Sequence, residues 1–197
     1  ATVRSSTVNH QYSKSFAFEQ DFRTYFQKYL ADHISYFSFL RPWNELRIVK
    51  AFTGFKKHHS SFRSCNAGSK TDSWCTSCSK CLFTFIMLSP FLSEAEKISI
   101  FGEDLFNKRA MIPILDELIG RTPEKPFECV GTIDEVNAAL VASIKKHHRY
   151  LPLLLEYYKH TEQFEQYKDL SLDSLLNAFN DKHFLDGSYL SLIKNKA

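Results

Sequence analysis

Four cysteines that lie close together constrain the fold of this chain more than any other feature of its sequence. They are Cys65, Cys75, Cys78 and Cys81, and their spacing is C-x9-C-x2-C-x2-C. Two residues between cysteines suit a tight turn that directs both sulfurs to one centre, and four thiolates fill the tetrahedral shell of a structural zinc ion. Such a site has no open coordination position. The spacing therefore predicts a loop pinned by metal, not a metal that performs chemistry.

The same spacing leaves other interpretations open. An iron–sulfur cluster also takes four cysteines, often two residues apart, and a redox dithiol needs only two. Disulfides are a further alternative, but the first residues lack the apolar core of a secretory signal. Paired C-x2-C cysteines are typical of metal or redox sites inside cells. Cysteine usage therefore indicates a reducing, cytoplasmic compartment.

Length and composition set broad limits. The 197 residues suggest one domain or one and a half, and 44% hydrophobic residues with 18 Phe predict a phenylalanine-rich core. The net charge of +3 and the lack of a basic stripe give no indication of nucleic-acid binding. The sequence contains no run of 18 apolar residues, so no membrane span is predicted. The strongest change in composition lies near residue 120. It suggests a zinc-containing part over residues 1–120 and a helical region over 121–197.

Apolar residues at three- and four-residue spacing predict helices over most of the chain. Capping boxes at Ser93 with Glu96 and at Thr132 with Glu135 mark two of the helix starts. Alternating aromatic residues over 34–40 predict one short strand. The expected fold is therefore mostly α. The expected helices cover residues 16–31, 44–52, 78–89, 94–102, 103–119, 132–148, 151–167 and 171–180.

Two polar stretches are candidates for chemistry. Residues 121–132 hold two prolines and a glycine, which predict an ordered loop, and they carry Glu128 and the fifth cysteine, Cys129. A lone cysteine is more often a small buried hydrophobe, but a position near a helix start can lower its pKa. Residues 8–15 have two interpretations. They form either a solvated segment before the first helix or a loop that binds phosphate or carboxylate, in which Lys14 precedes a helix N-terminus.

Several motifs resemble known families. Residues 40–49, followed by Arg63 and the cysteines, resemble the C-terminal part of the ATP-pyrophosphatase group that includes 7-cyano-7-deazaguanine synthase. A wider set of motifs resembles more closely the bacterial UDP-N-acetylmuramoyl-L-alanyl-L-glutamate epimerase family of peptidoglycan precursor synthesis. The most specific of them is Lys-Pro-Phe-Glu-Cys-Val-Gly at 125–131. The set comprises residues 8–15, 63–66, 74–81, 88–91, 100–102 and 125–132.

The resemblance implies a fold and an activity. The chain would be the helical C-terminal portion of an α/β ATP-pyrophosphatase-like protein with a four-cysteine zinc loop. It would belong to an ATP-dependent epimerase that inverts the terminal L-Glu of UDP-MurNAc-L-Ala-L-Glu, with ATP and Mg bound where the upstream nucleotide-binding half is present. The Ser-Gly-Gly-x-Asp-Ser phosphate loop expected in that half does not occur in this sequence. We therefore interpret the chain as a fragment of a longer enzyme.

The resemblance also suggests roles for single residues. Cys129 is the candidate acid or base for the α-proton of glutamate, and Glu128 is a second candidate. His10 and Lys14 are candidates for contact with substrate or phosphate. Two alternatives stay open, a non-catalytic zinc-stabilised helical binding module and an ATP-pyrophosphatase-type enzyme that modifies nucleobases. The weak net charge counts against the second alternative.

Overall fold

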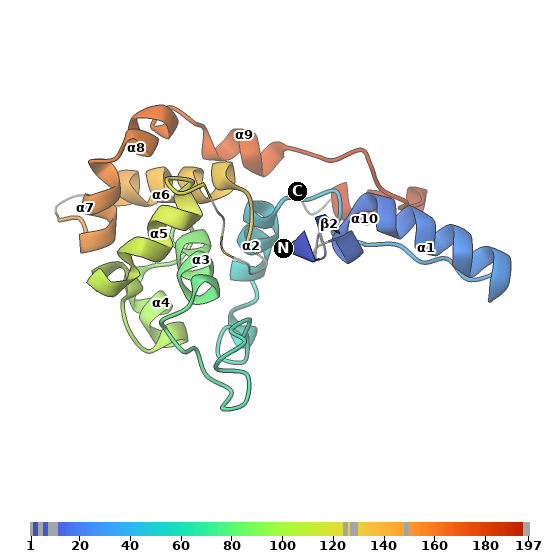
Figure 1. The fold of residues 1–197 in the computed structure, drawn as a ribbon, viewed down its shortest axis with the longest axis horizontal. Helices are drawn as coiled ribbons and strands as arrows, with labels where there is room; N and C mark the ends of the chain where they lie inside the picture. The colour runs from blue at the N-terminus through green and yellow to red at the C-terminus, as the bar shows by residue number, and fades with distance from the viewer. Residues whose placement is uncertain are drawn as a thin grey trace. The chain divides into compact units, whose positions relative to one another are not determined.

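The computed structural model describes residues 2–3, 6–7, 12–123, 126, 130–147 and 150–194, and it confirms a mostly helical chain (Figure 1). The two short strands pair antiparallel, with Thr2 opposite Thr7. The α-helices are α1 (Phe16–Tyr29), α2 (Glu45–Thr53), α3 (Ser79–Leu88), α4 (Glu94–Phe101), α5 (Ile112–Ile119), α6 (Ile133–Lys146), α7 (Leu153–Lys159), α8 (Glu162–Tyr167), α9 (Leu172–Asn177) and α10 (Gly187–Lys194). The remaining elements are β1 (Thr2–Val3), β2 (Ser6–Thr7), η1 (Tyr12–Lys14), η2 (Lys56–His58), η3 (Leu105–Asn107) and η4 (Arg109–Met111).

The chain forms two compact units. Unit 1 comprises residues 1–44 and 178–197, and unit 2 comprises residues 45–177. The first and last segments of the sequence therefore share a unit, with unit 2 inserted between them. The boundary near residue 120 that composition suggests stays a prediction. Within the described residues, no helix combines the length and the apolar character that crossing a bilayer requires.

Unit 2 is built around α3. Eight of the ten residues of this helix are buried, because its sequence is apolar on all sides and α2, α5 and α6 pack against it. Phe85 on α3 meets the rings of Phe101 and Phe106 edge-on, at centroid distances of 5.2 and 5.0 Å. Each such buried side chain contributes roughly 1.5–3 kcal/mol through the hydrophobic effect. Among the described residues, however, the 28 buried members of the core cluster include 11 Leu and 4 Phe, so the core is richer in leucine than in the phenylalanine that composition predicts.

Two helices of unit 2 begin with the capping boxes that their sequences predict, Ser93 with Glu96 at α4 and Thr132 with Glu135 at α6. In the second box the carboxylate of Glu135 is buried. Glu135 Oε2 accepts hydrogen bonds from the backbone N–H and the hydroxyl of Thr132, at 2.9 and 2.7 Å. Its Oε1 accepts the N–H of Leu46 in the first turn of α2, at 3.2 Å. One carboxylate therefore stabilises the N-terminal ends of two helices.

Glu135→Gln is expected to lower the free energy of unfolding by about 2 kcal/mol, because an amide group must face at least one of these donors. Glu96→Gln is the matched control, since Glu96 makes the same box at the surface. Its expected cost is under about 1 kcal/mol. Urea titrations of both variants measure the difference. Equal costs would contradict the double role of Glu135.

A buried lysine also lies in unit 2. Lys97 on α4 is 3% exposed, and its Nζ donates to the hydroxyl of Ser89 at 3.0 Å. The ammonium lies over the rings of Phe85 and Phe106, 4.3 and 4.6 Å from their centroids. Burial lowers the pKa of Lys97 to about 8, and the nearby Lys146 acts in the same direction. The two rings and the hydroxyl offset part of the cost of burying the charge.

This lysine is expected to make stability depend on alkaline pH. Between pH 8 and 10.5 the unfolded chain binds a proton at Lys97 that the folded chain does not, so stability rises with pH in that window, by up to about 3 kcal/mol. Lys97→Met removes this rise, whereas Lys50→Met, at an exposed lysine, retains it. Urea unfolding at several pH values measures the effect. A constant difference between wild type and Lys97→Met over the window would contradict it.

Two expected helices are interrupted. Residues 103–119 form η3, η4 and α5, because the extended backbone of Lys108 separates the two 3-10 helices. Pro113 lies in the first turn of α5, where its missing N–H costs nothing, and it does not kink a longer helix. The helix expected over 151–167 is divided into α7 and α8. Thr161 caps the second of these helices with its hydroxyl.

One further local prediction is wrong. Residues 34–40 form no strand, and in the described part of the chain β1 and β2 pair only with each other. An alternating pattern alone does not supply the partner strand that a ladder needs. Farther along the chain, the Asp186 carboxylate accepts the N–H groups of Ser188 and Tyr189 at the start of α10.

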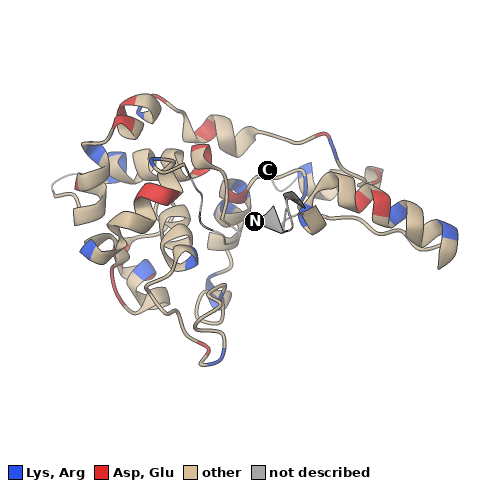
Figure 2. Ribbon diagram, viewed as in Figure 1, with Lys and Arg blue, Asp and Glu red and all other residues tan. Residues whose placement is uncertain are grey.

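Unit 1 consists of α1, its flanking segments and α10. Ser15 caps α1 because its side chain accepts the N–H of Phe18. Glu19 is the buried residue of α1, and its carboxylate accepts from the backbone of Ser38 and from the guanidinium of Arg41. Burial raises the pKa of Glu19, but these two donors outweigh it and hold the pKa below its usual value. Figure 2 shows acidic and basic positions along the same helix.

Candidate functional site

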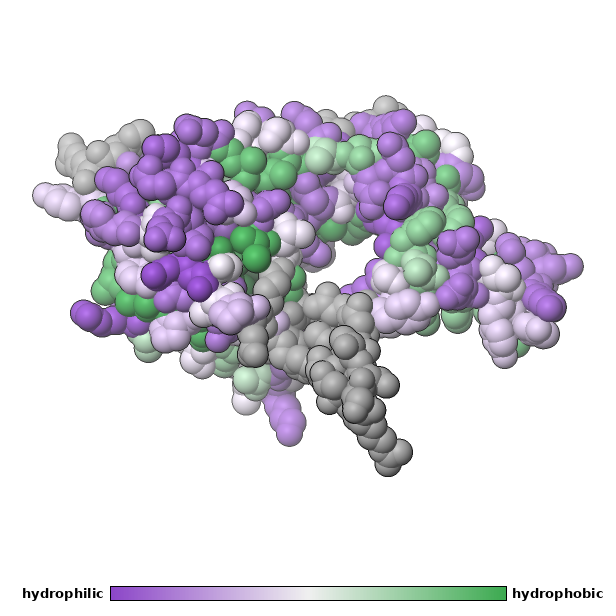
Figure 3. Space-filling model, turned by 45° about the horizontal axis from the view of Figure 1, so that its top comes forward, coloured by the Kyte–Doolittle hydropathy of each residue, from purple (hydrophilic) through white to green (hydrophobic). Residues whose placement is uncertain are grey.

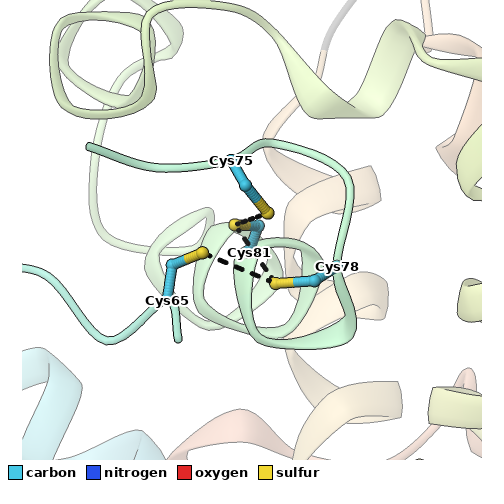
Figure 4. Close-up of side chains that lie close together, drawn as sticks. All are labelled: Cys65, Cys75, Cys78 and Cys81. Carbon is cyan, nitrogen blue, oxygen red and sulfur yellow. Dashed lines mark hydrogen bonds between the residues drawn. The ribbon is translucent and has the colours of Figure 1, made fainter. Parts of the chain in front are cut away.

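The four cysteines of unit 2 come together in space (Figure 4). Their Sγ atoms all lie within 4.8 Å of one another. The distance is 3.8 Å from Cys65 to Cys78, 3.6 Å from Cys75 to Cys81 and 3.5 Å from Cys78 to Cys81. All four are free thiols, so the disulfide interpretation does not describe this arrangement. The group could hold a metal ion.

The geometry can be tested against a single tetrahedral ion. Zinc–sulfur bonds of about 2.3 Å place the corners of a tetrahedron about 3.8 Å apart. Three of the six sulfur–sulfur distances are 3.5–3.8 Å and all six are within 4.8 Å, so the four sulfurs lie close enough to share one ion. In a four-iron cluster each thiolate binds a different iron, which sets the sulfurs farther apart. The donor set therefore fits one ion better than a cluster.

Local structure brings these sulfurs to one place. Cys78 is the N-cap residue of α3 and Cys81 lies in its first turn, where the positive end of the helix dipole favours thiolates. Cys65 reaches the centre from a loop, and its Sγ accepts the backbone N–H of Gly68 at 3.3 Å. Thr76, between the second and third cysteines, has a φ of 54°, which is rare for a β-branched residue. The loop is therefore held in a strained conformation.

Contacts from outside the loop hold that conformation. The ammonium of Lys108 donates to the carbonyl oxygen of Thr76 at 2.9 Å and to Glu103 at 2.9 Å. Lys80 on α3 donates to the side chain of Asn66 at 3.0 Å. The sequence did not predict the role of Lys108, because 32 positions separate it from Thr76.

Gly68 is the tightest backbone position of the loop. Its carbonyl oxygen accepts the N–H groups of Thr71 and Ser73, and a Cβ added at Gly68 would lie 1.8 Å from the oxygen of Ser73. Gly68→Ala is therefore expected to displace the loop, lower metal affinity at least tenfold and cost at least about 2 kcal/mol of stability. Competition with a chromogenic chelator measures the affinity. Gly187→Ala is the control, because a Cβ there meets no atom within 4 Å.

The pKa values of the cysteines are shifted in opposite directions. Burial raises the pKa of Cys75, but hydrogen bonds from Ser77 outweigh it and lower that pKa to about 6. Burial raises the pKa of Cys78 to about 11 and raises the pKa of Cys81 as well. A thiolate at Cys75 thus lies beside two thiols, Cys78 and Cys81, that keep their protons. A bound cation would displace those protons, so metal affinity falls as pH is lowered.

The other predicted site residues do not join this cluster. Lys14 ends η1 in unit 1, where it is exposed and its backbone oxygen accepts from Arg41 at 3.2 Å. His10, Glu128 and Cys129 lie outside the described residues. The sites proposed for them therefore stay predictions.

The residues that follow Cys129 in the sequence are tightly packed. Val130 packs against the core of unit 2. A Cβ added at Gly131 would lie 3.1 Å from the carboxylate of Glu135 and from the ring of Phe83. Because Glu135 also joins α2 to α6, residues 130–131 are anchored where these helices begin. An unanchored surface loop would lack such contacts.

Comparison with known proteins adds family matches. A family model described as the MurL C-terminal domain matches residues 59–171, which hold the four cysteines and most of unit 2. A second model, described as the MurL N-terminal domain, matches residues 1–39, which belong to unit 1. No solved structure gives a significant match.

Three curated relatives share the name UDP-N-acetyl-alpha-D-muramoyl-L-alanyl-L-glutamate epimerase. The protein from Xanthomonas oryzae pv. oryzae is 37% identical over 139 residues, which cover 68% of this chain and 31% of the relative. Those from a Micromonospora species and from Salinispora tropica are 36% and 37% identical over 137 residues, covering 68% of this chain and 31% and 30% of the relatives. The chain thus spans about a third of the length of these relatives.

Proposed function

The chain belongs to the MurL family, and we propose that it forms the C-terminal part of an ATP-dependent epimerase. The proposed reaction inverts the α-carbon of the terminal L-Glu in UDP-MurNAc-L-Ala-L-Glu, a step of peptidoglycan precursor synthesis. The observation that carries the proposal is the 36–37% identity to three relatives that bear this name. We further propose the C-terminal, helical portion of an ATP-pyrophosphatase-like α/β protein as its structural context.

The chemistry explains a need for ATP. The α-proton beside a free carboxylate is very weakly acidic, because its removal would place negative charge next to negative charge. Attack of that carboxylate on the α-phosphorus of ATP forms an acyl-adenylate and releases pyrophosphate. The carbonyl can then accept the electron pair of the broken C–H bond as an enolate. A proton returns on the opposite face, and water cleaves the adenylate to give the epimer and AMP.

Residues of this chain have proposed parts in that sequence. Cys129 takes or returns the α-proton, with Glu128 as the second candidate, and the packing of Val130 and Gly131 supports a fixed position for the end of this stretch. His10 and Lys14 contact the phosphates or the acidic substrate. A rigid support matters because acid–base catalysis depends on a proton donor held within hydrogen-bonding distance.

We propose zinc as the ion that Cys65, Cys75, Cys78 and Cys81 hold. Sulfur spacings near 3.8 Å and a donor set of four thiolates support this assignment. Four cysteines leave no site for substrate on the ion, so its proposed role is to fix the loop before α3. ATP with Mg would bind to an upstream nucleotide-binding half. The proposed setting is the cytoplasm, with the UDP-linked muramoyl dipeptide as substrate.

The test joins the upstream part of the Xanthomonas relative to this chain and supplies UDP-MurNAc-L-Ala-L-Glu in D₂O. Mass spectrometry follows deuterium at the glutamate α-carbon, and chiral analysis follows the product. Deuterium uptake that requires ATP and yields D-Glu supports the proposal. A substrate that keeps its α-proton, with active Xanthomonas enzyme as the positive control, overturns it. Uptake without ATP would remove the adenylate from the mechanism.

A further inference from the structure

The apolar side chains of helix α1 are incompletely covered: Phe16 and Phe22 contact Phe184 and Tyr36, but the C-terminal end of the helix is open to solvent. Its apolar residues recur at helical spacing, yet the one side chain that it buries is the carboxylate of Glu19. Tyr25 and Tyr29 contact each other, with centroids 5.0 Å apart, and they are 56 and 61% exposed. Leu30, the next residue, is 63% exposed. A 14-residue helix is marginal in water without tertiary packing, so α1 needs a partner surface.

Unit 1 as a whole also leaves many apolar side chains exposed and buries few of them. Of the twelve large apolar side chains that are exposed in the described part of the chain, ten belong to unit 1. Every described member of the buried core cluster belongs to unit 2, whereas unit 1 buries Leu185 and Ile193. Hydrophobic and near-neutral side chains are visible at the surface in Figure 3. Exposure on this scale is typical of an interaction surface or of an incomplete domain.

The C-terminal segment contributes to this surface. The rings of Phe16 and Phe184 stack at 4.9 Å, and the guanidinium of Arg23 lies 4.4 Å from the centre of the Phe184 ring. Tyr189 on α10 contacts Phe37 at 4.8 Å while 40% of it stays exposed. Residues 178–194 fall outside both family-model matches, which end at 39 and 171. The segment that completes unit 1 is therefore one that the family matches do not include.

We propose that the exposed face formed by α1, residues 30–40 and α10 is the docking surface for the remainder of a MurL N-terminal domain. The match to that domain model lies in unit 1, over residues 1–39, and the relatives are about three times longer than their match to this chain. The required occupant is thus a folded polypeptide with an apolar, aromatic-accepting surface. This inference rests on the proposal that the chain is part of a longer enzyme, not on the epimerase chemistry.

The composition of the face favours a protein partner, and its geometry argues against a second copy of this chain as that partner. Four of the exposed side chains on this face are tyrosines, which bury large area at low entropic cost and are enriched at protein interfaces. A second copy of this chain would need both copies to present the same surface to each other. In that arrangement the two copies would cover each other's faces, and the rest of each N-terminal domain could no longer pack there.

Hydrogen–deuterium exchange tests the proposal in two forms of the protein, the chain as given and the fusion to the upstream part of the Xanthomonas relative. In the chain alone, amides of α1 are expected to exchange at least a hundredfold faster than those of α3. In the fusion, protection of α1 is expected to rise at least tenfold. Tyr25→Ser combined with Tyr29→Ser is expected to cancel that gain. Tyr150→Ser, an 89% exposed tyrosine of unit 2, is the control and keeps it.

Three results would overturn the proposal. They are full protection of α1 in the monomeric chain, protection that depends on chain concentration and so reports a homodimer, and a fusion in which α1 exchanges as fast as before. The fusion also carries the ATP-dependent deuterium assay. A protected α1 without α-proton exchange would contradict the proposed function alone, and exchange with an unprotected α1 would contradict the docking alone.

Discussion

Cys81→Ser is expected to remove the metal and to lower the free energy of unfolding by more than about 4 kcal/mol. Cys81 is fully buried and lies in the first turn of α3, the central helix of unit 2. Structural zinc contributes about 10–16 kcal/mol of apparent binding free energy in small zinc domains, and loss of one thiolate forfeits a large part of it. Whole domains are stable by only about 5–15 kcal/mol. Elemental analysis and thermal unfolding measure the two losses.

The matched control is Cys129→Ser, which removes the fifth cysteine and leaves the four ligands in place. It is expected to keep one zinc per chain. Thiol titration is expected to find one reactive thiol in the wild type and none in this control. A wild-type chain without metal and with five reactive thiols would contradict the zinc centre. Stability of Cys81→Ser equal to that of the control would contradict the structural role of the metal.

Cys129→Ala is expected to slow ATP-dependent exchange of the glutamate α-proton by 10²- to 10⁴-fold, the range that one acid–base group supplies. The measurement uses the fusion that carries the upstream half, because the adenylate must form first. Release of pyrophosphate is expected to continue, since the cysteine acts after that step. This split between the two signals separates a proton-transfer role from a collapse of the fold.

Glu128→Gln is the companion variant. If it loses exchange while Cys129→Ala retains it, the proton transfer belongs to the carboxylate and the assignment to Cys129 is wrong. If neither variant changes the exchange rate, residues 125–131 hold no proton-transfer group. An equal loss of pyrophosphate release in both variants would indicate a role in adenylation instead.

Features that depend on near neighbours in sequence could be predicted. The C-x2-C spacings predicted a common centre for four sulfurs, and the two capping boxes predicted where α4 and α6 begin. Gly102 and Gly120 end α4 and α5 with φ values of 88° and 83°, the left-handed conformation that glycine adopts without strain. Each of these signals is contained in a few consecutive residues.

Features that depend on distant residues could not be predicted. Glu135 accepts from Leu46, 89 positions away, and no local pattern reveals that a capping carboxylate serves a second helix. The strand expected over 34–40 failed for a related reason, because alternation describes one strand but not its partner. Lys97 reads as an ordinary helix surface residue in the sequence. Its burial follows from where the rings of Phe85 and Phe106 lie.

The divided make-up of unit 1 has a consequence for synthesis on the ribosome. Helix α1 emerges before unit 2, whereas Phe184 and α10, which complete unit 1, emerge after it. The 133 residues of unit 2 separate the two segments, and at about 5–20 residues per second their translation takes roughly 7–27 s. The nascent α1 therefore spends that interval without its C-terminal neighbours. A premature stop after residue 177 would leave the sequence of unit 2 whole, yet remove from unit 1 the segment that stacks on Phe16 of α1.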